Sequence, residues 1–472
     1  MSCWNLELLP SNQYLTSSLP SAILALLHCS AGFIVDYGRD GWGTGTPPFS
    51  GDYFVPGSPA EGWVAEWTEG STSFNTVNKG LMQQNGMMPP THIEITSHEN
   101  KQASFWVGKT GNLRVSKVTQ FSDSGSASTD DLHFSTSVTL KNEGTSPITN
   151  LYYMRTVDPD QEQEHTGKYA TSNWVDSQRF VNGETPSNRA EGPTGSACTS
   201  AQAANGECTN KCFVAAVGQT YAATYCGLGA INSHCRVNHW GFNNNDASDS
   251  WANTLWQSHS EGNRRNWDEA IQLHFFYETI QPGATVQFNY AYVLGAAALD
   301  PAMQALDFVS ITSPTDVISG VYALFQAEIA QEALAGGGIP TRADFYIYAM
   351  LEGAGLNAWH PIESITTKPD GGALDSTSRT FSSTVLVPND YEEGVGQLKV
   401  VIALDDGSKY DQQMVVEITE GVAMCWDLNL DNNGEVRRSK ERSDELTAVA
   451  IPKKIAHTYT SIQDAPPQQP PQ

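Results

Sequence analysis

Apolar and polar residues alternate at every second position in several segments of the chain. The segment 132–141, LHFSTSVTLK, places Leu, Phe, Val and Leu on one side and His, Ser and Thr on the other. The segments 271–277 and 286–294 show the same alternation, and the turn-forming pair Pro282-Gly283 lies between them. A period of two is typical of half-buried antiparallel strands. Because no long amphipathic helix is predicted before residue 299, we expect one large β-sandwich domain over residues 32–298.

The pattern changes at Asp300, which can cap a short helix that has Pro301 at its first position. We therefore predict a linker with a short helix over residues 299–312. Short strands follow at regular spacing over residues 313–425, and Asp405-Asp406-Gly407 predicts a hairpin turn between the last two. This size and spacing are typical of a smaller immunoglobulin-like sandwich. Residues 426–472 are polar, end in PPQQPPQ, and predict a partly disordered tail.

Two segments of the large domain carry a resemblance to known proteins. These are NEGTSPITNLYYMRTVDPD, residues 142–160, and the ending PG-x4-F-x-Y-x-YVLG, residues 282–295. They resemble the β-sandwich modules of secreted and surface proteins, including the supersandwich folds attached to polysaccharide-active enzymes. The resemblance covers about half of the chain. It implies an all-β fold and transfers no catalytic residue.

The charge of the chain excludes two classes of partner. Acidic residues outnumber basic residues 52 to 26, which gives a net charge of -26. Phosphate binding needs a basic surface, so we expect no nucleic-acid partner and no binding to an anionic membrane. The longest apolar stretch, residues 22–35, is too short and too interrupted to span a bilayer.

The same apolar stretch has two interpretations. It fits the central region of a signal peptide over residues 1–31, with small residues at Cys29-Ser30-Ala31 before the cleavage position. However, no basic residue precedes Arg39, so the stretch could instead form the first strand or helix of the folded domain. The first interpretation, together with the low content of charged residues, predicts an extracellular or cell-surface protein.

A cluster of cysteines lies inside the large domain. The cluster comprises Cys198, Cys208, Cys212, Cys226 and Cys235. In an extracellular chain we expect at least two disulfides among them. The alternative is a zinc site that uses Cys208 and Cys212 with Cys226, Cys235 or His239, although the spacing matches no standard zinc motif.

An acidic run follows the segment 151–155, which ends at Arg155 just before the first carboxylate. Its members at alternate positions are Asp158, Asp160, Glu162 and Glu164. Four carboxylates so close repel one another, and Arg155 can neutralise only one of them, so the run predicts a Ca²⁺ site. The alternative is a solvated acidic turn.

Aromatic residues beside amide and acid side chains predict a sugar-binding surface. Aromatic rings stack on the apolar faces of sugars, and neighbouring polar groups bind the hydroxyls. The segment 239–256 combines both kinds of residue, and the predicted ligand-binding set is Trp240, Asn243, Asn244, Asp246, Trp251 and Trp256. The alternative is that these tryptophans are buried between the sheets.

No sequence motif for catalysis is present, since the chain contains no nucleophile elbow, no HExxH and no Walker loop. We therefore predict a non-catalytic secreted or surface protein that binds polysaccharide or joins a surface assembly. The rival is a polysaccharide hydrolase or lyase with a carboxylate pair in a groove, for which Asp158, Asp160, Asp268 and Glu269 are candidates. A purely adhesive module, with every tryptophan buried, is a third hypothesis.

Overall fold

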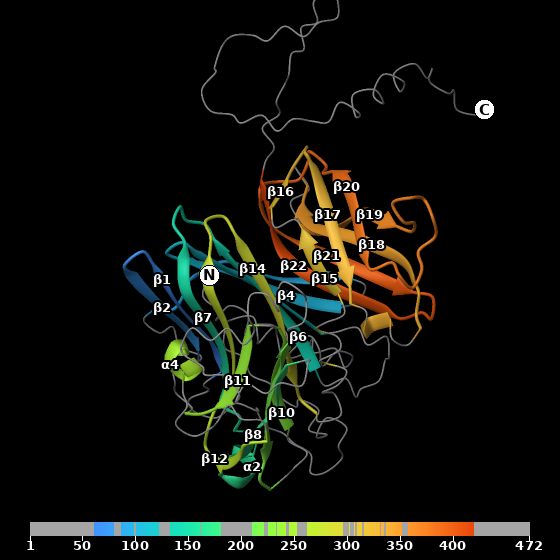
Figure 1. Ribbon diagram of the computed structural model, residues 1–472. Coiled ribbons are helices and arrows are strands. Elements are labelled where there is room, and N and C mark those ends of the chain that lie inside the picture. The colour runs from blue at the N-terminus through green and yellow to red at the C-terminus, as the bar shows by residue number, and fades with distance from the viewer. Residues whose placement is uncertain are drawn as a thin grey trace, which may run out of the picture. The chain divides into compact units, whose positions relative to one another are not determined.

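The computed structural model describes most of the chain between residues 61 and 419 (Figure 1). All of these residues belong to one compact unit, residues 1–421. The described ranges are 61–79, 86–98, 101–121, 133–160, 162–180, 210–220, 225–232, 234–241, 245–252, 262–295, 309–313, 316–330, 332–334, 337–351 and 357–419, with residues 302 and 306. The predicted signal peptide, most of the predicted linker and the predicted tail lie outside the described residues.

The prediction of an all-β sandwich protein is confirmed. Over the described ranges, two antiparallel sheets form the large sandwich, with strand orders β11-β13-β7-β1-β2 and β12-β8-β9-β10-β14-β6-β5-β4-β3. The strands of the first sheet are β1 (Gly62–Glu69), β2 (Thr72–Lys79), β7 (Ile148–Val157), β11 (Cys235–His239) and β13 (Ile271–Ile280). The strands of the second are β3 (Pro90–His98), β4 (Lys101–Thr110), β5 (Leu113–Phe121), β6 (His133–Asn142), β8 (Thr171–Phe180), β9 (Asn210–Gly218), β10 (Tyr225–Ile231), β12 (Arg264–Trp267) and β14 (Thr285–Val293).

The predicted alternation in β13 is present, but both of its faces are buried. Leu273 and Phe275 point into the core between the two sheets, as the pattern predicts. Phe276, on the opposite face, packs with Trp251 of the short helix α4 (Ala247–Ala252), which covers this side of the sheet. The strand is therefore not half-exposed, because a helix predicted by no sequence pattern shields its second face.

A second pair of sheets encloses a separate hydrophobic core that contains Phe325, Phe345 and Val400. In the part of the chain that the structure describes, these sheets have the orders β15-β17-β20 and β16-β22-β21-β18-β19. One 3-10 turn, η4 (Glu332–Leu334), lies after β17, and the predicted hairpin at Asp405–Gly407 joins β21 to β22. The strands are β15 (Val309–Ser313), β16 (Asp316–Ile318), β17 (Tyr322–Ile329), β18 (Pro340–Met350), β19 (Asn357–Ile365), β20 (Thr380–Leu386), β21 (Gly394–Leu404) and β22 (Lys409–Thr419).

A polar group crosses the core of the large sandwich. The guanidinium of Arg155 on β7 donates to the hydroxyl of Tyr292 on β14 at 2.7 Å and forms an ion pair with Glu61. The Tyr292 hydroxyl in turn donates to the Glu61 carboxylate at 2.7 Å. All three side chains are buried, so each hydrogen bond satisfies a group that would otherwise be costly to remove from water. The expectation that Arg155 neutralises the acidic run is therefore wrong, because its charge is used inside the core.

One disulfide also joins the two sheets of the large sandwich. Cys212 on β9 is bonded to Cys235 on β11, whereas Cys226 on β10 is a buried free thiol. One of the predicted bridges is thus confirmed, and Cys198 and Cys208 lie outside the described residues. The zinc alternative loses the Cys212 and Cys235 thiolates, because both sulfur atoms are consumed in the bridge.

We expect the double variant Cys212→Ala, Cys235→Ala to remain folded with a lower free energy of unfolding. The bridge closes a chain segment with a sequence separation of 23 residues. Loop-closure entropy then predicts a loss of about 3 kcal/mol, measured by urea denaturation. Free-thiol counting provides the control, since the buried Cys226 should react only after unfolding. An unchanged denaturation midpoint would show that the bridge contributes nothing to stability.

Candidate metal centre and aromatic surface

Three neighbouring strands of the five-stranded sheet end at the same level. Ile271, the first residue of β13, is paired with Val157, the last residue of β7. On its other side Ile271 is paired with His239, the last residue of β11. The loops that follow β7 and precede β13 therefore emerge side by side at one end of the sandwich, and both carry acidic residues.

The loop after β7 contains two tight backbone turns, and it carries the carboxylates of Asp158 and Asp160. The backbone N–H of Asp160 donates to the carbonyl of Asp158 at 3.1 Å, and the N–H of Gln163 donates to the carbonyl of Asp160 at 3.0 Å. The loop then forms one helical turn, α2 (Gln163–Thr166), which ends at Gly167 in the left-handed conformation. Both aspartates are buried.

The loop before β13 is anchored by Glu269. Its buried carboxylate contacts the Nδ1 atom of His239 at 2.9 Å and accepts a hydrogen bond from the guanidinium of Arg265 at 2.5 Å. The Nε2 atom of His239 also contacts the Oδ1 atom of Asn263 at 3.2 Å. These bonds fix the backbone on both sides of Asp268, whose side chain is half-buried.

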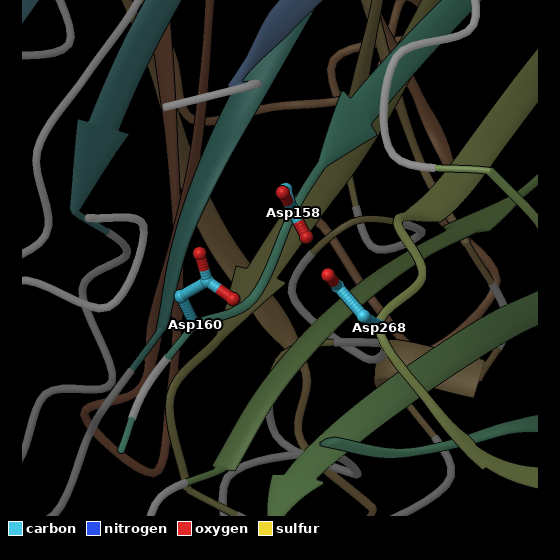
Figure 2. A group of neighbouring side chains, drawn as sticks. All are labelled: Asp158, Asp160 and Asp268. Carbon is cyan, nitrogen blue, oxygen red and sulfur yellow. The ribbon is translucent and has the colours of Figure 1, made fainter. Parts of the chain in front are cut away.

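Asp158, Asp160 and Asp268 converge at this end of the sheet. One carboxylate oxygen from each residue lies within 4.8 Å of those of the other two. In Figure 2 the Asp158 and Asp268 carboxylates point toward one another, and Asp160 lies alongside them. We refer to these three residues as the aspartate cluster.

Burial and mutual repulsion disfavour negative charge in the aspartate cluster. Removal from water, followed by the charges of Asp158 and Asp268, raises the pKa of Asp160 to about 8. Burial and the charge of Glu269 also raise the pKa of Asp268. Within the described part of the chain, the buried Oδ1 atom of Asp160 has no hydrogen-bond partner. This is an unusual position for a carboxylate oxygen, because buried polar atoms are nearly always bonded.

Glu162 and Glu164, the other two residues of the predicted metal set, are not part of the aspartate cluster as the structure describes it. Both carboxylate oxygens of Glu162 accept from the backbone N–H of Thr220, at 2.8 and 3.1 Å. Its side chain lies against Gly218, where any side chain would overlap the carboxylate. Glu162 therefore binds the backbone just after β9 and does not belong to the cluster. The side chain of Glu164 lies outside the described residues. Asp268, which sequence analysis considered only as a catalytic candidate, takes the third position.

The predicted sugar-binding residues do not form one exposed surface. Trp251 is 3% exposed and packs against the five-stranded sheet, so it is a core residue and the prediction of an aromatic platform there is wrong. Trp240 is half-buried. Asp246 is exposed, but its carboxylate accepts from the N–H of Asp249 at the start of α4. Asn243, Asn244 and Trp256 lie outside the described residues.

Two other aromatic side chains are exposed in the chain segments that carry the aspartate cluster. Trp267, which immediately precedes Asp268, is 58% exposed, and Tyr169 is 47% exposed. Trp267 is paired with Thr171, the first residue of β8, and Tyr169 lies two residues before it. We refer to Trp267 and Tyr169 as the aromatic pair. The predicted ligand-binding set contained neither residue, because it was confined to the segment 239–256, which combines tryptophan with asparagine. The available signal was the neighbouring Asp268.

Comparisons with known proteins place the chain in no family. No family model and no curated protein matches it. A superoxide reductase (neelaredoxin) from Ignicoccus hospitalis is 9% identical, with a TM-score of 0.18, over 24% of this chain and 80% of that one. A provisionally assigned aldose 1-epimerase from Escherichia coli is 8% identical, with a TM-score of 0.22, over 48% and 78%. Red sea bream transglutaminase is 9% identical, with a TM-score of 0.16, over 66% and 32%. Likenesses this weak carry no argument about function.

We expect the metal-free protein to lose stability as the pH rises from about 5 to about 8. In this range the folded protein retains a proton on Asp160, because its pKa is raised from 3.8 to about 8, whereas the unfolded chain has released it. The free energy of unfolding then falls with increasing pH. Melting temperatures in chelator at both pH values test this expectation.

The control variants are Asp160→Asn, which should flatten the dependence, and the exposed Asp249→Asn, which should not. An identical pH dependence in the wild type and in Asp160→Asn would contradict the assignment to Asp160.

Proposed function

We propose that this chain is a non-catalytic secreted or cell-surface protein that binds polysaccharide through its large sandwich. The observation that carries the proposal is the aromatic pair. Trp267 and Tyr169 are 58% and 47% exposed, although large aromatic side chains usually remove most of their surface from water. Exposed rings beside acidic groups suit sugars, which present apolar ring faces and hydroxyl edges.

The backbone under the pair is rigid. The side-chain amide of the buried Asn173 donates to the carbonyl of Trp267 at 3.1 Å. The guanidinium carbon of Arg265 lies 5.2 Å from the centre of the Trp267 ring, which supports one face of the indole. The side chain of Gln163 donates to the Tyr169 hydroxyl at 3.4 Å. Held in this way, the rings lose little conformational entropy when a sugar binds.

The remaining parts of the proposal concern the compartment and the cofactor. A disulfide that joins two buried strands fits an oxidising, extracellular environment. Among the described residues, no helix is long and apolar enough to cross a membrane. The cofactor included in the proposal is Ca²⁺, since the groups beside the aromatic pair are carboxylates, which are hard oxygen ligands.

A polysaccharide hydrolase or lyase is the second candidate. Its support is the convergence of carboxylates next to an exposed tryptophan, because retaining glycosidases use two carboxyl groups about 5 Å apart. However, Asp158 and Asp160 are only 6% and 8% exposed. Of the three clustered carboxylates only Asp268 is half-exposed, which leaves one carboxylate rather than a pair at the surface. The geometry therefore favours binding over cleavage.

We expect Trp267→Ala to weaken binding to an insoluble polysaccharide by roughly tenfold, and Tyr169→Ala to have a smaller effect. The loss of one stacked aromatic ring removes about 1 to 2 kcal/mol of binding free energy. Depletion assays against a panel of polysaccharides provide the measurement. The matched control is Tyr322→Ala, because Tyr322 is 52% exposed but belongs to the smaller sandwich. Equal binding by all three variants, or no binding by the wild type, would remove the proposal.

The enzymatic alternative is tested with the same panel. We expect no release of reducing ends and no formation of unsaturated products by the wild type. Cleavage that disappears in Asp160→Asn and in Asp268→Asn, but not in the exposed Asp249→Asn, would establish the second candidate instead.

A further inference from the structure

We propose that Asp158, Asp160 and Asp268 form a Ca²⁺ site that joins the loop after β7 to the loop before β13. The residues belong to two segments that are more than a hundred positions apart in the sequence, and the register of β7 and β13 brings them together. The site differs from a local acidic loop because its third ligand comes from the neighbouring strand connection.

The spacing of the oxygen atoms fits Ca²⁺. Calcium–oxygen distances of about 2.3 to 2.6 Å place two ligands of one ion up to about 5 Å apart. The three carboxylate oxygens lie within 4.8 Å of one another, so a point between them is no more than about 2.8 Å from each, close to a calcium–oxygen distance. Magnesium demands near-ideal octahedral geometry at about 2.0 to 2.1 Å, which three carboxylates from two loops suit less well.

A second observation points to a ligand at this position. Asp160 is only 8% exposed, and its Oδ1 atom has no hydrogen-bond partner among the described residues. A buried carboxylate oxygen without a partner is costly in free energy. A cation between Asp160 and the other two carboxylates would satisfy this oxygen and remove the repulsion among the three groups.

The chemistry of the donors selects a hard cation. All three groups are carboxylates, and the site contains no thiolate. The nearest imidazole along the strand ends, His239, already contacts Glu269 and Asn263 through its two ring nitrogens. Oxygen-only ligands favour Ca²⁺ over zinc or copper. Water molecules would complete the coordination shell on the half-exposed side of Asp268.

The ion would also fix the two chain segments that carry the aromatic pair. The importance of this effect for sugar binding rests on the proposed function. Asp268 directly follows Trp267, and the loop after β7 leads into α2, where Gln163 donates to the Tyr169 hydroxyl. Calcium would therefore tie both aromatic side chains to one centre. Polysaccharide affinity should then be higher with Ca²⁺ than in chelator.

Isothermal titration of the full chain with Ca²⁺, after treatment with chelator, tests the site. We expect one saturable site in the wild type and a loss of affinity of at least about tenfold in Asp160→Asn and in Asp268→Asn. The matched control is Glu278→Gln, which removes the same charge from an exposed position near the other end of β13. Equal affinity in the wild type and both aspartate variants, or no binding at all, overturns the proposal.

Thermal unfolding separates loss of the metal site from misfolding. At a hundredfold excess over its dissociation constant, Ca²⁺ should raise the melting temperature of the wild type by roughly 5 °C. Asp160→Asn should melt at or above the wild-type temperature in chelator, because its amide stays neutral at every pH, and should not respond to Ca²⁺. A calcium response that persists in both aspartate variants places the ion elsewhere and overturns the proposal.

Polysaccharide depletion with and without Ca²⁺ distinguishes the two proposals. Calcium binding without any polysaccharide binding leaves the metal site standing and removes the proposed function. Polysaccharide binding with no calcium titration signal removes the metal site and leaves the proposed function standing. Calcium binding that leaves polysaccharide affinity unchanged overturns the link between the ion and the aromatic pair.

Discussion

The hydrogen-bonded ladder of β11, β13 and β7 is the constraint on which the candidate site depends. It pairs His239 with Ile271 and Ile271 with Val157, so that three strand ends meet at one level. A slip of one residue would turn every side chain of a strand to the opposite face. The register is held because one face of these strands forms the core of the large sandwich, while α4 covers Phe276 on the other face.

Two connections hold the sheets of this sandwich face to face. The Cys212–Cys235 bridge joins β9 to β11, and the Arg155 guanidinium joins β7 to the Tyr292 hydroxyl on β14. Each connection involves one strand, β11 or β7, whose last residue lies at the end of the sheet that carries the aspartate cluster. The loops at that end thus rest on a scaffold that is fixed across the core as well as within the sheet, which suits a site that must hold its geometry.

In the proposed binding site the aspartate cluster and the aromatic pair would have different roles. The carboxylates lie mostly below the surface, where desolvation raises the pKa of Asp160 and favours compensation by a cation. The rings of Trp267 and Tyr169, in contrast, are largely open to solvent. Glu269 links the two groups, because it holds the segment that carries both Trp267 and Asp268 through its contacts with His239 and Arg265.

The sequence by itself determined the class of fold and several of the strands. The alternation in 132–141, 271–277 and 286–294 gave β6, β13 and β14, because a two-residue period depends only on the local choice of apolar and polar side chains. Local composition also identified Asp158 and Asp160 as members of an acidic group. The third member, Asp268, and the exposure of Trp267 depend on which strands pair, and so only the tertiary structure decided them. For the same reason Trp251, which sequence placed on a binding surface, became a core residue once α4 packed against the sheet. Contacts between distant segments leave no periodic signal in either segment.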